Sequence, residues 1–176
     1  MTNTDAVNGT ITVLDQGTVI SYTVGEVMKY HGPGFPGGVA HAVKVLERAL
    51  PLLGVDGPVA RREIEIATAH RGPGVRDTIE MVTRAVTEDR FTVDSALERT
   101  DRGATLERYV FVLTYRGRSV RLEIREGFVT DEFISLGRRT DRSFEEDARL
   151  TVLKQEMADR LLASPAADVY DVVGEK

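Results

Sequence analysis

Residues 62–87 read REIEIATAHRGPGVRDTIEMVTRAVT, and this stretch decides the fold. In residues 63–67, charged and apolar side chains alternate, which predicts a half-buried strand. In residues 75–86, apolar side chains recur every three or four positions, which predicts a helix with one buried face. A Gly-Pro-Gly turn at 72–74 separates the two patterns. Strand, loop and helix therefore form one compact unit with His70 in its loop.

An earlier stretch, HGPGFPGG at residues 31–38, uses the same loop chemistry. Before it, Thr23 and Glu26 have the spacing of a capping box, which predicts a short helix that runs to about residue 30 and leaves His31 at its end. After it, apolar residues at positions 39, 43, 46, 50 and 53 predict a long helix that ends at Gly54. Only the loop and the following helix recur, which is too little similarity for an array of structural repeats. We therefore interpret the two loops as independent occurrences of the same loop chemistry.

Further strands are predicted on both sides of these units. Residues 11–22 have the pattern of a β-hairpin with a glycine in its turn, residues 91–93 that of a short strand, and residues 109–125 that of an antiparallel hairpin. Helices and antiparallel strands are mixed without regular βαβ alternation. The sequence therefore predicts an α+β fold in which a mixed, largely antiparallel sheet packs against helices.

A last helix is expected to begin at Ser143, to carry an apolar stripe, and to end before Pro165. The basic run at 138–142, which precedes it, is interpreted as an exposed connector because neighbouring acidic residues dilute its charge. The length of 176 residues suits one core domain. The predicted organisation is an N-terminal hairpin extension at 1–22, a core domain at 23–173 and a tail at 174–176.

Composition restricts the classes of function. The net charge of −5 and the pI of about 5.3 create no general attraction for nucleic acid or an anionic membrane, so neither partner is expected. The chain has no cysteine, which excludes disulfides, thiolate nucleophiles and iron–sulfur ligation. The first residues lack the pattern of a signal peptide and no stretch is apolar enough to span a membrane, so a cytoplasmic location is expected.

The loop at 32–37 satisfies the pattern G-x-G-x-x-G and precedes a helix. A dinucleotide-binding loop follows a buried strand, whereas this loop follows a capped helical turn and contains two prolines that cannot donate a backbone hydrogen bond. The dinucleotide interpretation is therefore disfavoured. A glycine-rich loop at a helix N-terminus still favours a carboxylate, phosphate or sulfate, and the alternative is a tight turn between packed helices.

Only three histidines are present, and their side chains have an ordinary pKa near neutral. His31 and His70 lie beside the glycine loops, where ligand contacts concentrate, although a loop histidine also serves as a hydrogen-bond partner of a backbone carbonyl. His41 falls inside the first long helix and is interpreted as a packing or surface residue.

Three charged residues belong to the second loop and the helix after it. Asp77 either orients His31 or His70 as a general base or simply stabilises the helix N-terminus. Arg71 and Arg76 either hold an anionic substrate through paired hydrogen bonds or are solvated loop charges.

The stretch His31-Gly32-x-x-x-Pro36-Gly37, which opens a helix, resembles the signature of the FmdE-like domain family, which takes its name from a component of formylmethanofuran dehydrogenase. Three further stretches fit this resemblance: the loop that ends at Asp77, the region 99–125 with its Gly103, and the closing LLASPAADVYDV at 161–172. The similarity spans roughly residues 23–173, and its motifs are short.

The resemblance implies an α+β core domain, frequently dimeric, that occurs as an accessory subunit of a molybdenum or tungsten enzyme and as a free-standing bacterial protein. It also implies that many members hold a metal through a second histidine and two cysteines in these loops. Those three positions are held here by Pro33, Phe35 and Gly74. His31 and Asp77 are left, with His70 as a further candidate ligand, and because a zinc site normally has at least three protein ligands, no metal site is predicted.

We therefore predict a small-molecule-binding domain, homodimeric, whose cavity lies between the two glycine-rich loops and takes a small organic, anionic ligand. The leading hypothesis adds acid–base catalysis without a cofactor, of the isomerase, cyclase or lyase type, with His31 as acid or base, Asp77 as its orienting partner and His70 beside them. The alternatives are a non-catalytic accessory subunit or ligand sensor, and a zinc- or iron-dependent enzyme. The residues expected to bind the ligand are Gly32, Gly34, Phe35, Gly37, Arg71, Gly74 and Arg76.

Overall fold

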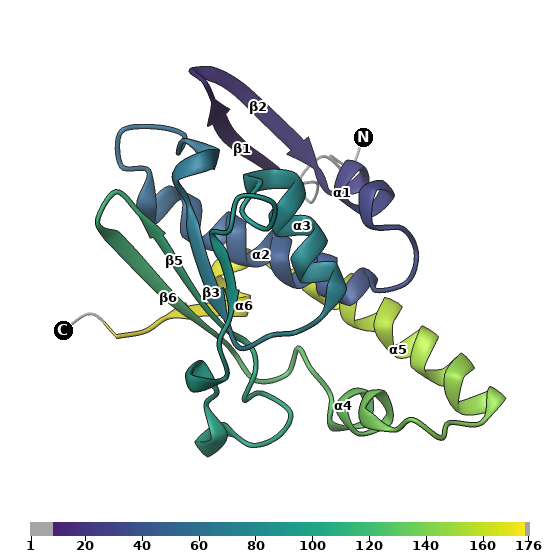
Figure 1. The fold of residues 1–176 in the computed structure, drawn as a ribbon. Coiled ribbons are helices and arrows are strands. Elements are labelled where there is room, and N and C mark those ends of the chain that lie inside the picture. Colours follow the sequence, from purple (N-terminus) through teal and green to yellow (C-terminus); the bar gives the residue numbers. More distant parts are fainter. Residues whose placement is uncertain (1–8, 175–176) are drawn as a thin grey trace, which may run out of the picture.

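A computed structural model describes residues 9–174, and the predicted α+β class is confirmed: helices pack against a five-stranded, largely antiparallel sheet (Figure 1). Residues 1–8 of the expected hairpin extension and residues 175–176 of the expected tail lie outside the described residues.

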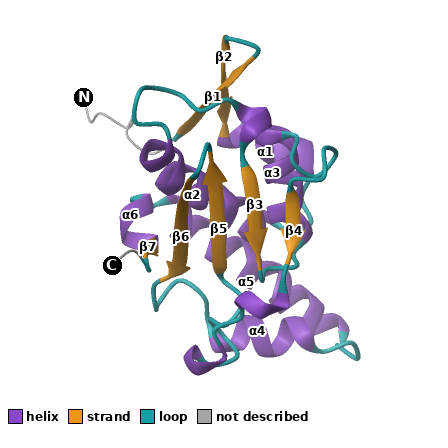
Figure 2. Ribbon diagram, turned by 60° about the vertical axis from the view of Figure 1, so that its left-hand side comes forward, coloured by secondary structure: helices purple, strands orange, loops and turns teal. Residues whose placement is uncertain are grey.

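The main sheet has one parallel pair of strands, at one of its edges, and is otherwise antiparallel. Figure 2 shows its strands side by side with helices behind them. In spatial order the strands are β4 (Phe91–Val93), β3 (Glu65–Thr68), β5 (Val110–Tyr115), β6 (Arg118–Ile124) and β7 (Tyr170–Val172). The strands expected at 63–67, 91–93 and 109–125 are confirmed with small shifts at their ends, whereas β7 is an element that the sequence pattern did not predict.

The core lies between this sheet and the helix α2 (Pro36–Leu53). Phe111 on β5 stands opposite Leu122 on β6, and both side chains are fully buried. Each side chain of this size contributes roughly 1.5–3 kcal/mol to folding when it is removed from water. The apolar stripe predicted for α2 is buried along its whole length, from Val39 to Leu53.

The other helices are α1 (Val24–His31), α3 (Pro73–Thr83), α4 (Asp131–Arg138), α5 (Phe144–Leu162) and α6 (Ala166–Val169). Helices α3 and α5 pack on α2, α1 packs on α3, and α4 packs on α5. The expected helix starts are confirmed, since Thr23 with Glu26 and Ser143 with Glu146 both form complete capping boxes.

Two helices differ from expectation. Helix α3 ends at Thr83 rather than near residue 86, because Arg84 turns into the left-handed region with φ 61° and the guanidinium groups of Arg61 and Arg90 donate hydrogen bonds to its last carbonyls. Helix α4 was not predicted; it is short and half exposed, so it lacks the buried apolar stripe by which helices are detected.

The N-terminal hairpin pairs β1 (Thr10–Asp15) with β2 (Thr18–Thr23), as expected, through a turn in which Gly17 has φ 81°. It is fastened to the core rather than projecting freely: Val13 is fully buried, and Asp15 accepts hydrogen bonds from Arg61 and Arg62. These hydrogen bonds, that of Arg62 first, lower the pKa of the Asp15 carboxyl.

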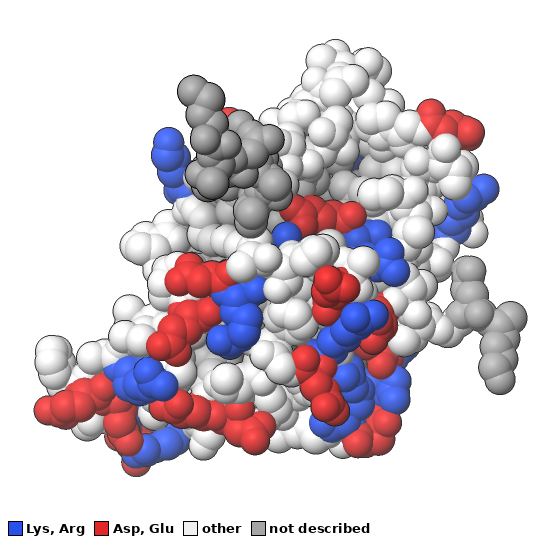
Figure 3. Space-filling view, turned by 180° about the vertical axis from the view of Figure 1, so that it is seen from behind, with Lys and Arg blue, Asp and Glu red and all other residues white. Residues whose placement is uncertain are grey.

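Among the helices of residues 9–174, none combines the length and the apolar composition that a membrane crossing requires. Figure 3 shows acidic and basic side chains interspersed on the face of the molecule seen from behind.

Candidate functional site

The two glycine-rich loops lie against each other where α2 and α3 begin. A Cβ atom added at Gly74 would lie 2.7 Å from the carbonyl oxygen of Phe35 and 2.8 Å from the backbone nitrogen of Val39. A Cβ atom at Gly38 would lie 3.1 Å from the Cα atom of Gly74. Because the opposing atoms belong to the backbone, only glycine allows the two helix starts to approach this closely.

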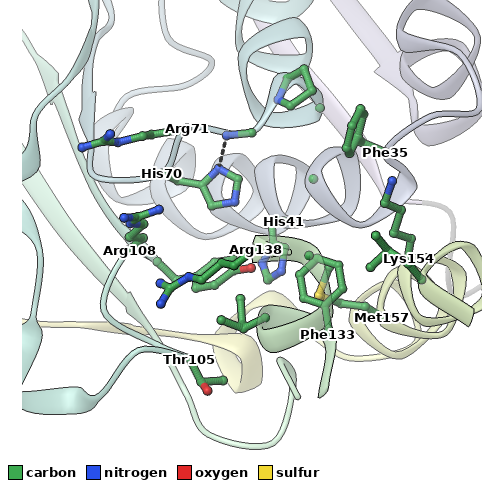
Figure 4. Close-up of a pocket in the computed structure, with 18 of the residues that line it drawn as sticks. Phe35, His41, His70, Arg71, Thr105, Arg108, Phe133, Arg138, Lys154 and Met157 are labelled. Atoms are coloured by element: carbon green, nitrogen blue, oxygen red, sulfur yellow. Dashed lines mark hydrogen bonds between the residues drawn. The ribbon is translucent and has the colours of Figure 1, made fainter. Parts of the chain in front are cut away.

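A cavity of about 410 Å³ opens beside this contact (Figure 4). Its wall comes from the start of α2, the loop 70–74, the loop 104–109, helix α4, the following connector, and α5. Of the site residues predicted from the sequence, His70, Phe35, Arg71 and Gly74 line this cavity.

The predicted pair His31 and Asp77 forms, but it lies outside the cavity wall. The His31 Nδ1 atom is 2.7 Å from the Asp77 carboxylate, and the His31 side chain is 5 % exposed. Phe35 lies next to this pair and does line the cavity; its ring centroid is 6.1 Å from that of His31. Of the roles that the sequence left open for Asp77, the structure has the hydrogen bond to His31, and neither residue of this pair lines the cavity.

Four other predicted contacts are also absent from the wall: Gly32, Gly34, Gly37 and Arg76. Gly32 ends α1 with φ 86°, and its N–H donates to the Met28 carbonyl. The Gly34 carbonyl accepts a hydrogen bond from Lys154, Gly37 is packed against Met157, and Arg76 is exposed on α3. These glycines therefore shape the backbone or its packing, and Gly38 is the α2 glycine that reaches the cavity.

His70 is held in one tautomer by its own loop. The backbone N–H of Gly72 donates to His70 Nδ1 at 3.0 Å, which leaves Nε2 to carry the proton of the neutral ring. Burial, and then the charge of Arg108, lowers the pKa of His70 to about 4. At neutral pH this imidazole is therefore a hydrogen-bond donor and a poor base.

His41 is a second imidazole in the cavity wall, and the sequence interpretation as a packing residue missed this role. It is fully buried, and its Nδ1 atom lies 2.8 Å from the hydroxyl of Tyr170. Its Nε2 atom has no hydrogen-bond partner among the described residues. Burial, followed by the charges of His70 and Arg160, lowers the pKa of His41 well below its ordinary value.

The two imidazoles belong to an aromatic cluster. The ring of Tyr109 lies 4.6 Å from that of His41 and 5.0 Å from that of His70, measured between centroids. Burial raises the pKa of both Tyr109 and Tyr170, so that their hydroxyls stay protonated. This part of the cavity is therefore uncharged at neutral pH.

The charged part of the wall is entirely basic. The five charged side chains that line the cavity, besides the histidines, are Arg71, Arg108, Arg138, Arg142 and Lys154, and no described Asp or Glu is among the lining residues. The arginines form single ion pairs with carboxylates behind the wall, such as Arg108 with Glu98 at 3.2 Å and Arg138 with Glu107 at 2.9 Å. Because a guanidinium has five N–H donors, these pairs leave donors free for a ligand.

Of these five cations, only Arg71 was predicted from the sequence. Arg138 and Arg142 lie in the basic run that was interpreted as an exposed connector. Arg138 is exposed, as expected, but it is the last residue of α4, and both arginines also line the cavity. The basic run itself was the signal that could have found them. Arg108 and Lys154 had no such signal, because they belong to segments that only the tertiary fold brings to the loops.

Apolar side chains cover the opposite side of the cavity. Figure 4 shows the guanidinium groups of Arg71, Arg108 and Arg138 on one side of His70, with Phe133 and Met157 on the other. On that second side, Lys154 Nζ stands 4.0 Å from the centre of the Phe35 ring. Burial, and then the charge of Arg142, lowers the pKa of Lys154.

No group of three or more His, Cys, Asp or Glu side chains in residues 9–174 has the arrangement of a metal site. His31 and Asp77 alone supply fewer ligands than a zinc site normally has. No protein-family model matches the chain, and no curated protein matches it. The resemblance to the FmdE-like domain family stays a prediction.

Proposed function

We propose that this protein binds a small organic anion with an apolar body in the cavity between its two glycine-rich loops. The observation that carries the proposal is the composition of the wall, in which five cationic side chains line the cavity together with apolar ones and no described carboxylate does. The homodimer and the cytoplasmic location expected from the sequence stay predictions.

The charge of the wall supports an anionic ligand. Arg71 approaches a carboxylate only at 3.9 Å, and Arg108 uses its Nε atom for Glu98, which leaves its terminal nitrogens without a partner among the described residues. Guanidinium groups bind carboxylate, phosphate and sulfate through two parallel hydrogen bonds. An anion in the cavity therefore gains directed hydrogen bonds as well as charge attraction.

The size and the apolar side of the wall support an apolar body. A volume of about 410 Å³ lies within the ordinary range of small-molecule sites, roughly 300–1,000 Å³. Phe133, Leu150 and Met157 line the cavity, and each offers apolar surface that a ligand removes from water when it binds. A ligand that is apolar at one end and anionic at the other matches both sides.

The protonation states favour binding over general-base catalysis. His70 and His41 are neutral at pH 7, and the Nδ1 atom of each already has a hydrogen-bond partner. The histidine that is paired with a carboxylate, His31 with Asp77, does not line the cavity. The function of a non-catalytic accessory subunit or ligand sensor therefore fits the geometry better than the acid–base enzyme of the leading sequence hypothesis.

Fluorescence titration with a matched pair of dyes tests the proposal. The anionic probe is 8-anilinonaphthalene-1-sulfonate, and the uncharged probe of similar shape is N-phenyl-1-naphthylamine. We expect saturable, stoichiometric binding of the sulfonate, and about tenfold weaker binding by Arg108→Gln, the loss expected when one charge-assisted hydrogen bond is removed. Binding of the uncharged dye should change little.

Arg118→Gln is the matched control, because Arg118 is exposed on β6 and does not line this cavity. It should bind both dyes as the wild type does. If Arg108→Gln and Arg138→Gln both retain full affinity for the sulfonate, the arginines do not hold the anion and the proposed function is wrong.

A further inference from the structure

The positive charge of the cavity wall is divided between two ends of the cavity. In Figure 4 the guanidinium groups of Arg71, Arg108 and Arg138 lie at one end, and Lys154 lies at the other. Apolar side chains, such as that of Phe133, also line the cavity. The proposed function uses the arginine end for the anionic group of the ligand and gives the charge at the lysine end no role.

At the arginine end, neighbouring carboxylates leave part of the positive charge uncancelled. Arg71 Nη2 and Arg108 Nε lie 3.9 Å and 3.2 Å from the same oxygen atom, Oε1 of Glu98. Arg138 pairs with a different carboxylate, that of Glu107, at 2.9 Å. Three cations therefore share two carboxylates of the described residues, and the equivalent of one positive charge remains for a ligand.

At the lysine end, Arg142 has a carboxylate partner and Lys154 has none among the described residues. Arg142 Nε lies 2.7 Å from the Asp147 carboxylate. Lys154 Nζ donates a hydrogen bond to the Gly34 carbonyl at 3.3 Å and lies 4.0 Å from the centre of the Phe35 ring. Because an ammonium has three N–H donors, two of them remain for a ligand. A second positive charge is therefore available at this end.

The position of Lys154 lets its ammonium reach a molecule in the cavity. The side chain lines the cavity and is half-buried, and Phe35, against which the ammonium lies, also lines the cavity. The charge is carried on a flexible four-carbon stem. The ammonium can therefore turn toward an anion while helix α5 stays in place.

We infer that the ligand has two acidic groups, one at each end of its apolar body, and that Lys154 binds the second. This inference rests on the proposed function and narrows the ligand to a class: a dicarboxylate, or a related diacid, with an aromatic or alkyl body. The net charge of the chain is −5, so general attraction does not favour a dianion over a monoanion. A preference for the dianion must come from the cavity itself.

Pairs of rigid aromatic acids that differ only in a second carboxylate test the inference. The pairs are benzoate with benzene-1,4-dicarboxylate, 2-naphthoate with naphthalene-2,6-dicarboxylate, and biphenyl-4-carboxylate with biphenyl-4,4′-dicarboxylate, in order of increasing distance between the carboxylates. Calorimetric titration of the full chain should show the dicarboxylate of at least one pair bound about tenfold more tightly. This is the gain expected from one charge-assisted hydrogen bond.

The variant Lys154→Met removes the charge and keeps a side chain of similar length. In this variant the preference for the dicarboxylate should disappear, whereas the monocarboxylate should bind as it does to the wild type, which shows that the cavity is intact. Lys154→Arg keeps the charge and should keep the preference. The matched control is Lys29→Met, because Lys29 is exposed on α1 and does not line this cavity. It should also keep the preference.

The outcomes separate the inference from the function on which it rests. If the monocarboxylate and the dicarboxylate of every pair bind equally well, the lysine end does not bind a second anion, and the site for one anion stands. If Lys154→Met keeps the preference, the second acidic group is bound by another residue and the inference is wrong. If neither kind of acid binds to the wild type, the inference and the proposed function are both overturned.

Discussion

At the scale of single residues, His70 shows how a loop turns a titratable group into a fixed donor. The Gly72 N–H selects its tautomer, and burial with the nearby Arg108 lowers its pKa to about 4. Without the neighbouring glycine the ring could present either nitrogen to the cavity. The Gly-Pro-Gly turn therefore positions an imidazole as well as beginning a helix.

We predict that His70 makes the protein less stable as the pH falls from 6.5 to 4. Over this range the unfolded chain, with an ordinary histidine pKa of 6.5, binds a proton that the folded chain does not bind until about pH 4. The stability present above pH 6.5 is lost as the pH decreases, by at most about 3 kcal/mol for this group. Denaturant unfolding at several pH values measures the loss.

The variant His70→Phe isolates this contribution, because it lacks the titrating group while the carboxylates and His41 are shared with the wild type. Between pH 6.5 and 4 its free energy of unfolding should fall less steeply than that of the wild type. Parallel pH profiles for the two proteins would show that His70 is not held neutral by the fold.

At the scale of secondary-structure elements, the contact between the starts of α2 and α3 depends on glycine. We predict that Gly74→Ala lowers the free energy of unfolding by about 1–3 kcal/mol, because the new methyl group meets the backbone of Phe35 and Val39, which cannot move aside as a side chain can. Thermal or denaturant unfolding measures the change.

Gly137→Ala is the matched control on α4, because a Cβ atom at that position meets no atom within 4 Å. Alanine also favours a helix over glycine by about 1 kcal/mol, so this variant should be unchanged or slightly more stable. A Gly74→Ala protein as stable as Gly137→Ala would mean that the two helix starts do not touch.

The ends of a helix could be predicted from the sequence where residues close by in the chain determine them. The capping residues Thr23 and Ser143 identified helix starts because a cap needs only the next three residues. The end of α3 was missed because its last carbonyls are bound by Arg61 and Arg90, which come from other parts of the chain. Such tertiary capping leaves no periodic pattern to detect.

At the scale of the whole molecule, the cavity has a charge opposite to that of the chain. The formal net charge is −5, yet the charged side chains lining the cavity are basic. From composition alone, the chain was therefore expected to have no general attraction for anions. The fold brings arginines from separate segments of the chain together around His70. The sequence identified the two loops and offered His31 as one of two partners for Asp77, but it could not place Arg108 or Lys154 beside them.

The most direct test of the account is a crystal structure of the protein with 8-anilinonaphthalene-1-sulfonate bound. We predict the sulfonate within about 3 Å of guanidinium nitrogens of Arg108 or Arg138, with the naphthalene ring against Phe133 and Met157. A dye bound elsewhere on the molecule, or a cavity filled by its own side chains in the presence of saturating dye, would contradict the claim that this cavity is an organic-anion site.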